Sequence, residues 1–223
     1  MKSCPVTKLV VLLSVSVLAT ASLAAQDVHA IANKVDQRYD RLHTLQAQFT
    51  ETYSGAGMTR TESGTLLLKK PGEMRWDYDQ PRPKLFITDG KTAWFYVPGE
   101  KQARRAAVKQ LEDLRSPLRY LLGKTRLDKE LDGLSLASDQ KAVNPGDTVL
   151  RGTPKGMRDR VAETLLEVSP DGLIVRIVVE ELDGSVTEFR FHQQKENVQI
   201  ADQQFRFVPP PGVEIVAGAE MME

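Results

Sequence analysis

The three histidines of the chain are the first candidates for acid–base or metal chemistry, because a neutral imidazole can take up a proton or bind a metal near neutral pH. They are His29, His43 and His192. His29 and His43 fall on one predicted helix, too far apart to share a metal ion. His192 follows Phe191 near the end of a predicted strand. A histidine in such a place is usually a surface or packing residue, so the pattern favours that interpretation over a catalytic base.

Other reactive patterns are weak or absent from the sequence. It has no nucleophile elbow, zinc helix, phosphate-binding glycine loop or calcium loop. The carboxylates between Asp128 and Asp132 are typical of a solvated helix face. Glu180 and Glu181 are neighbours on a predicted strand, so they point to opposite faces and cannot form one acid–base pair. We therefore expect no enzyme, no metal site and no cofactor.

A small basic cluster is left, with two interpretations. Lys101, Arg104, Arg105 and Lys109 lie close together in the sequence. They form either ordinary solvated surface, which we prefer, or a binding patch.

The first 24 residues have the form of a secretory signal peptide. Lys2 and Lys8 give a positive start, and residues 9–23 are apolar. Small residues before Ala25 occupy the positions that signal peptidase recognises. The apolar run is short for a transmembrane helix, so a retained membrane anchor is the less favoured alternative. Cys4, the single cysteine, lies inside this segment. We therefore expect a protein that is secreted across one membrane and whose mature part has no disulfide.

Removal of residues 1–24 leaves 199 of the 223 residues, with 28 basic and 30 acidic side chains. That length suits one domain with a sizeable core, here residues 25–223. The nearly balanced charge argues against nucleic acid as a partner and against electrostatic membrane binding.

The first half of the mature chain begins with a predicted helix over residues 27–50, with Asp27 as its N-cap. The pattern near Ala47 already alternates, which indicates that the helix gives way to a strand there. Pro81, Pro83 and the Asp89-Gly90 pair then separate short runs with alternating faces. These runs predict strands at residues 64–69, 74–78, 85–88 and 93–97.

The middle of the chain, from Gln110 to Leu122, is rich in leucine and predicts one or two short helices. Residues 127–136 give no clear pattern. Three of the four Asp-Gly pairs then separate alternating runs, as in an antiparallel meander. The predicted strands are residues 148–151, 162–168, 173–181, 185–192 and 205–208.

Several predicted strands are apolar on both faces, most clearly residues 93–97 and 173–181. A single antiparallel sheet usually presents one polar face to water. Two explanations remain open from the residues alone. The helical segments cover an ordinary core, which such stripes usually form, or an apolar cavity of lipid size lies between them and the sheet.

Five sequence motifs span most of the mature chain. The pattern K-P-x-x-M-R-W-D-Y-x-x-P starts at Lys70, and D-G-K-T-A-W-F-Y starts at Asp89. L-x-x-L-Q-A-Q-F-T starts at Leu42, G-T-L-L-L-K-K-P at Gly64, and F-x-F-x-P-P-x-G-V at Phe205. Together these motifs, in this order, resemble the LolA family of periplasmic lipoprotein carriers.

The resemblance implies an α+β single domain. Its expected form is a strongly curved, incomplete antiparallel β-barrel with helices forming a lid over the apolar concave face. It also implies a monomeric carrier that takes acylated outer-membrane lipoproteins from an inner-membrane ABC transporter of the LolCDE type. The carrier delivers them to the outer-membrane receptor LolB or an equivalent. The residues we expect to line the lipid pocket are Met74, Trp76, Phe86, Trp94 and Tyr96 on the sheet, and Leu118, Leu121 and Leu122 on the lid.

One position departs from the family pattern. Its members often carry arginine before the strand-ending proline, where it bonds to the lid and holds the carrier closed. This chain has Lys70, which keeps the charge and loses the planar fork. We expect Lys70 to supply part of this lid latch.

Two other function classes compete with a carrier. A LolA-like sensor of lipids or lipoproteins in the cell envelope would bind without shuttling, but such proteins usually add another domain. A lipid hydrolase or transferase would need a nucleophile and a base, and no convincing pair is present in the sequence.

The signal peptide gives the first testable prediction. We expect the mature protein to start at Ala25 and to carry no covalent lipid, because the small residues before it fit signal peptidase. N-terminal sequencing and intact mass of the exported protein measure both properties. A chain that retains residues 1–24, or that carries an acylated cysteine, contradicts the prediction.

Overall fold

The computed structural model describes residues 27–108, 121 and 126–218. Its centre is one twelve-stranded sheet with the order β12-β6-β5-β4-β3-β2-β1-β11-β10-β9-β8-β7. The strands are β1 (Thr44–Gly55), β2 (Met58–Lys69), β3 (Glu73–Gln80), β4 (Lys84–Asp89), β5 (Thr92–Tyr96), β6 (Gln102–Ala107), β7 (Leu131–Leu136), β8 (Thr148–Pro154), β9 (Val161–Val168), β10 (Ile174–Glu181), β11 (Val186–Glu196) and β12 (Glu214–Ala217). All neighbours pair antiparallel except β12 and β6, which pair parallel.

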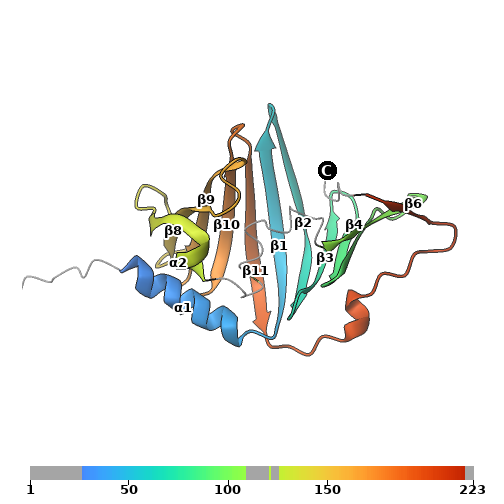
Figure 1. Ribbon diagram of the computed structural model, residues 1–223, viewed down its shortest axis with the longest axis horizontal. Coiled ribbons are helices and arrows are strands. Elements are labelled where there is room, and N and C mark those ends of the chain that lie inside the picture. The colour runs from blue at the N-terminus through green and yellow to red at the C-terminus, as the bar shows by residue number, and fades with distance from the viewer. Residues whose placement is uncertain (1–26, 109–120, 122–125, 219–223) are drawn as a thin grey trace, which may run out of the picture.

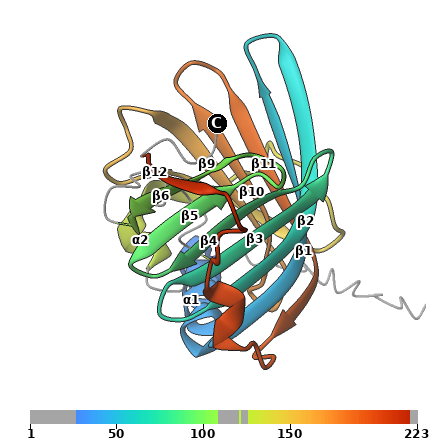
Figure 2. The same ribbon diagram turned by 90° about the vertical axis from the view of Figure 1, so that its right-hand side faces the viewer.

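The sheet is open and strongly curved, and α1 (Val28–Arg41) and α2 (Leu127–Glu130) lie on its concave side (Figures 1 and 2). Residues of α1 belong to the same buried cluster as the inward side chains of the sheet. The predicted fold class, a single domain built on an incomplete antiparallel barrel, is confirmed. The predicted helical segment of residues 110–122 lies outside the described residues except for Leu121.

Helix α1 is built as its spacing predicts, but it is shorter. Asp27 caps it by accepting a hydrogen bond from the backbone N–H of His29 at 2.9 Å. Ala32, Val35 and Tyr39 are buried along one face. The predicted end at residue 50 is wrong, because the helix ends at Arg41 and β1 begins at Thr44. β1 pairs with β2 on one side and with β11 on the other. These pairings favour the extended conformation, although the local sequence is also compatible with a helix.

The C-terminal prediction also needs correction. Residues 205–208 were expected to form a strand, but buried Phe205 ends a 3₁₀ helix, η4 (Asp202–Phe205), and residues 206–208 form neither helix nor strand. The segment crosses the outer face of β3 and β4 and then enters β12 at the edge beside β6 (Figure 2). Strand β6 was not predicted, because its sequence Gln-Ala-Arg-Arg-Ala-Ala has none of the β-branched and aromatic residues typical of strands.

The three Asp-Gly pairs that were predicted to separate strands lie in hairpin turns, at Asp89 between β4 and β5, at Asp171 between β9 and β10, and at Asp183 between β10 and β11. The Oδ1 atom of Asp89 accepts hydrogen bonds from the backbone N–H groups of Lys91 at 2.8 Å and Thr92 at 2.7 Å. Asp183 does the same for Ser185 at 2.8 Å. Such bonds fix the turn that sets each strand register.

The convex face has its own polar anchor under the loop that joins β7 to β8. Glu167, fully buried, accepts a hydrogen bond from Arg176 Nε at 2.7 Å. Its other oxygen accepts the backbone N–H of Val143 at 2.7 Å and of Asn144 at 3.1 Å. A buried charge needs such partners, and here they hold the loop against β9 and β10.

The close approach of β2 and β3 gives a testable prediction. A Cβ added at Gly64 would lie 1.8 Å from the carbonyl oxygen of Asp77, at an irregularity in the β2–β3 register. Gly64→Ala should therefore push the two strands apart and lower the free energy of unfolding by about 1–3 kcal/mol. Urea unfolding followed by circular dichroism measures the loss.

Gly218→Ala is the matched control, because its added Cβ would meet only side-chain atoms of Arg104, at 3.7 Å and beyond. Equal stability of the two variants would show that β2 and β3 adjust to a side chain at Gly64 without cost.

Candidate functional site

The concave face carries a cluster of aromatic rings centred on Trp76. Its ring lies 4.7 Å from that of Phe49, edge to face, and 5.7 Å from that of Phe189. Phe191 lies 6.5 Å from Trp76 and stacks on Phe189. Strands β3 and β11 are three spacings apart in the sheet, about 14 Å if it were flat. Their rings meet because the sheet curves and the side chains converge on its inner side.

Four of the predicted pocket residues lie in this buried region. Met74 and Trp76 on β3, Phe86 on β4, and Leu121 all belong to the one concave cluster. Leu118 and Leu122 lie outside the described residues. Side chains from α1, including Tyr39, complete the cluster on the helix side.

The structure places Trp94 and Tyr96 on the other face of the sheet. Their rings contact Phe207 of the C-terminal segment, at 5.4 Å and 5.7 Å between centroids. Their neighbour Phe95 points inward and belongs to the concave cluster. The predicted set is thus divided between two faces, because side chains of β5 alternate and both of its faces are apolar.

Sequence analysis missed six aromatic residues of the concave cluster: Tyr39, Phe49, Tyr78, Phe95, Phe189 and Phe191. The pairing of Phe49 with Phe191 across β1 and β11 brings segments together that are far apart in the chain. For Phe189 and Phe191, the sequence offers one signal, which is their alternation with polar residues along β11. That pattern indicates a buried face but not which partner strand completes it.

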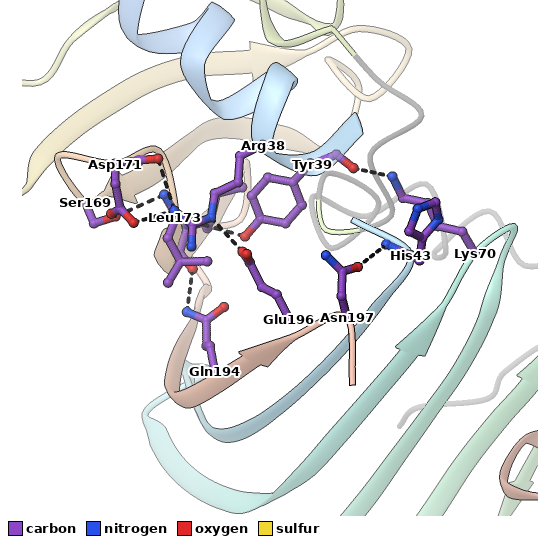
Figure 3. A network of polar contacts seen from close by, with 11 residues as sticks. Arg38, Tyr39, His43, Lys70, Ser169, Asp171, Leu173, Gln194, Glu196 and Asn197 are labelled. Carbon is purple, nitrogen blue, oxygen red and sulfur yellow. Dashed lines mark hydrogen bonds and ion pairs between the residues drawn. The ribbon is translucent and has the colours of Figure 1, made fainter. Parts of the chain in front are cut away.

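Helix α1 is held to the sheet at several points along its C-terminal half (Figure 3). The hydroxyl of buried Tyr39 accepts the backbone N–H of Ile174 at 3.2 Å, and burial raises the pKa of this phenol. Arg38 donates to Glu196 at 2.6 Å and also to the carboxylate of Asp171. These contacts reach both β10 and β11, so α1 is a fixed wall of the concave face.

Lys70 makes a further contact to the same helix. Its ammonium donates to the carbonyl oxygen of Tyr39 in the last turn of α1 (Figure 3). Its own backbone N–H donates to the carbonyl of His43 at 2.9 Å. Burial lowers the pKa of Lys70. A cation is favourable at a helix C-terminus, so the contact ties the turn after β2 to α1.

The concave face becomes polar toward the tips of the β1–β2 and β10–β11 hairpins. The hydroxyl of Tyr78 donates to Glu51 Oε2 at 2.7 Å, and Lys84 donates to Glu62 Oε2 at 2.6 Å. The Lys84 ammonium also lies 4.1 Å from the centre of the Tyr78 ring. We call Glu51, Glu62, Tyr78 and Lys84 the glutamate cluster. Burial raises the pKa of Glu51, although the bond from Tyr78 and the charge of Lys84 act against that rise.

Of the three histidines, His29 pairs with a carboxylate. His29 is exposed and its Nδ1 lies 2.9 Å from Asp128 Oδ1, which raises the pKa of the imidazole. Within the described part of the chain, no three His, Cys, Asp or Glu residues lie close enough to hold a metal ion.

Of the helices formed by residues 27–108, 121 and 126–218, none has the length and apolar character needed to cross a membrane.

Comparison with known proteins now adds to this geometry. Residues 40–208 match the family model of the outer membrane lipoprotein carrier protein LolA. The chain belongs to the LolA family. The matched range runs from the end of α1 through β1 to β11 and η4, and so includes the concave face described above.

Relatives of similar length are outer-membrane lipoprotein carrier proteins. An outer-membrane lipoprotein carrier protein of Xanthomonas campestris pv. campestris is 32% identical over 208 residues, which cover 92% of this chain and 97% of the relative. A carrier protein of the same description from Chromobacterium violaceum is 30% identical over 176 residues, with 78% and 82% covered.

Solved structures resemble the chain at the level of the fold. An uncharacterized conserved protein of Thermus thermophilus superposes with a TM-score of 0.55 at 14% identity, covering 86% of this chain and 100% of that one. The Mycobacterium tuberculosis lipoprotein LppX has a TM-score of 0.51 at 10% identity, with 78% and 98% covered. These identities are too low to say more than that the fold is shared.

Proposed function

We propose that this protein is a periplasmic carrier that binds the acyl chains of outer-membrane lipoproteins on its concave face. The observation that carries the proposal is the aromatic cluster around Trp76, which lies under α1 on the inner side of an open, curved sheet. Membership of the LolA family supports it. The matching relatives are outer-membrane lipoprotein carrier proteins.

The proposed transport route has two partners. The carrier takes the acylated lipoprotein from an inner-membrane ABC transporter of the LolCDE type and gives it to LolB or an equivalent receptor at the outer membrane. Residues 1–24 direct export to the periplasm, and residues 25–223 form the carrier domain, which acts as a monomer. The carrier performs no catalysis in this scheme, because both steps exchange one apolar surface for another.

The energetics of the cargo explain why an aromatic concave face suits this task. Each methylene group of an acyl chain that is removed from water contributes about 0.8 kcal/mol to the free energy of binding. A long acyl chain therefore has to stay bound to an apolar surface while it crosses an aqueous compartment. Large rings such as Trp76 and Phe49 offer broad contact without matching one chain shape. The same breadth lets the chain leave when the receptor offers an equal apolar surface.

Lys70 is the proposed latch. Its bond to the carbonyl of Tyr39 joins the turn after β2 to α1, the wall of the concave face. A hydrogen bond contributes about 0.5–1.5 kcal/mol net, enough to shift a closed-to-open ratio several-fold. Closure and cargo compete for the same apolar surface, so the latch helps to drive release.

Tryptophan fluorescence tests the placement of the cargo. Trp76 and Trp94 are the two tryptophans of the chain and lie on opposite faces of the sheet. Addition of an N-palmitoyl peptide should change the emission of the wild-type protein and of Trp94→Phe. The change should be lost in Trp76→Phe, because the ring that senses the acyl chain has been removed.

Trp94→Phe is the matched control for that experiment. A response that persists in Trp76→Phe and disappears in Trp94→Phe would place the acyl chain on the convex face, against the proposal.

A transfer assay tests the latch. Lys70→Leu should take up lipoprotein normally, since Lys70 lies outside the buried concave cluster. Transfer to the receptor should slow several-fold, because the turn after β2 no longer fastens to α1. The rate is measured by the appearance of labelled lipoprotein on the receptor.

The control is Lys69→Leu, since the adjacent Lys69 pairs instead with Asp202 of the C-terminal segment. Transfer by Lys70→Leu at the wild-type rate would make Lys70 an ordinary structural lysine.

A further inference from the structure

The concave face changes character along the strands of the β1–β2 hairpin. The inward residues of β1 run from Leu45 through Ala47 and Phe49 to Glu51, and then reach the hairpin tip. On β2, Glu62 lies directly opposite Glu51. Both glutamates are buried, at 9% and 8% exposure. The apolar surface therefore ends at two carboxylates inside the concave side rather than at solvent.

This arrangement does not favour stability. Like charges directly opposite on paired strands repel each other, and taking carboxylates out of water is costly. Glu62 pairs with Lys84 Nζ at 2.6 Å and with Arg60 Nε at 3.3 Å, but buried ion pairs seldom stabilise a fold more than apolar residues in their place. The raised pKa of Glu51 has this desolvation as its main cause. Two apolar residues at these positions would extend the cluster around Phe49 without these costs. We therefore look for a functional role of the two glutamates, because the stability of the fold does not explain them.

The bonds inside the glutamate cluster leave it with both donors and acceptors of hydrogen bonds. Tyr78 and Lys84 supply donors, and Glu51 and Glu62 supply acceptors. The ring of Tyr78 also packs 4.9 Å from that of Phe49, so the polar and aromatic parts touch. A ligand with an apolar tail on the aromatic cluster would place its polar head here.

A second observation lies on the other arm of the sheet. Thr164 on β9 is fully buried, and its Oγ1 has no hydrogen-bond partner among the residues that the structure describes. The register passes from Thr164 to Val179, Thr187 and Tyr53, so it lies in the row next to Glu51 on the same face. A buried hydroxyl without a partner is costly, which a ligand atom would relieve.

We propose, on the basis of the carrier function above, that the glutamate cluster selects acyl chains joined to a peptide by uncharged amide and ester groups and rejects free fatty acids. Amide N–H groups of the cargo donate to Glu51 and Glu62, and its carbonyl groups accept from the Lys84 ammonium, which has three hydrogens. Lys84 and Arg60 already balance the charges of the two glutamates through their ion pairs with Glu62. An uncharged head group keeps that balance, whereas the carboxylate of a free fatty acid adds an unpaired negative charge. Thr164 serves the same head group from the opposite arm of the sheet.

Competition binding tests the selection. The purified protein is titrated with N-palmitoyl peptide amide and with palmitate, each displacing one fluorescent acyl probe at neutral pH. The wild-type protein should prefer the acyl peptide by about tenfold or more, the scale at which a like charge excludes a wrong ligand. Glu51→Gln keeps an acceptor for Tyr78 and removes the charge, so its preference should fall at least about fivefold, mainly through tighter binding of palmitate.

Two further variants complete the design. Glu163→Gln is the matched control, because Glu163 pairs with Arg151 and shares the convex face with Leu165. Its preference should equal that of the wild type. Glu62→Gln repeats the charge removal at the opposite strand in case Glu51→Gln fails to fold, which thermal unfolding of each variant reports.

The outcomes separate this inference from the carrier function. Equal affinity of the wild-type protein for both ligands, or an unchanged preference in folded Glu51→Gln and Glu62→Gln, overturns the selection and leaves the carrier function standing. A wild-type protein that binds neither ligand overturns both.

Discussion

Convergence of side chains on the inner side of one curved sheet is the constraint on which the rest of the molecule depends. Trp76 contacts rings from β1 and β11 although its own strand is β3. Such contacts are available only where the sheet bends, and each ring that packs there stabilises the bend. The curvature in turn makes the inner face concave, so that a short helix can cover part of it while the sheet remains open.

The fixed position of α1 follows from the same geometry. Its apolar face packs into the concave cluster, while Arg38, Tyr39 and Lys70 tie it to three parts of the sheet. A helix of 14 residues would be marginal alone in water, so its stability comes from this packing. The bond from Lys70 to the carbonyl of Tyr39 therefore ends on a helix that is itself held in place.

Both faces of the sheet are covered, but by different means. The convex side receives Phe207 against Trp94 and Tyr96, and the buried Glu167–Arg176 pair holds a loop over β9 and β10. This covering accounts for the apolar residues on both faces of several strands. The glutamate cluster, by contrast, places charges at the boundary of the concave apolar surface, where a ligand with a polar head and an apolar tail would end.

The sequence by itself determined the family, the fold class, the start of α1 and the hairpin turns at Asp89 and Asp183. Those features depend on local patterns, such as capping, alternation and motif spacing, that the chain carries without its partners. Met74, Trp76, Phe86 and Leu121, which were predicted to share one face, lie in one buried cluster, and their role in binding lipid stays a prediction.

Only the tertiary structure decided the rest. Trp94 and Phe95 are both aromatic, so alternation could not tell which one faces inward, and the pairing of Phe86 with Phe95 settled it. The end of α1 at Arg41 and the pairing of Phe49 with Phe191 depend on β11, which lies more than a hundred residues further along the chain. The strand β6 and the 3₁₀ helix η4 have weak local patterns and are held by their neighbours at the sheet edge and on the convex face. Local sequence fixes what each segment prefers, but the face it presents is set by contacts between segments distant in the chain, and those contacts decide where a cargo can bind.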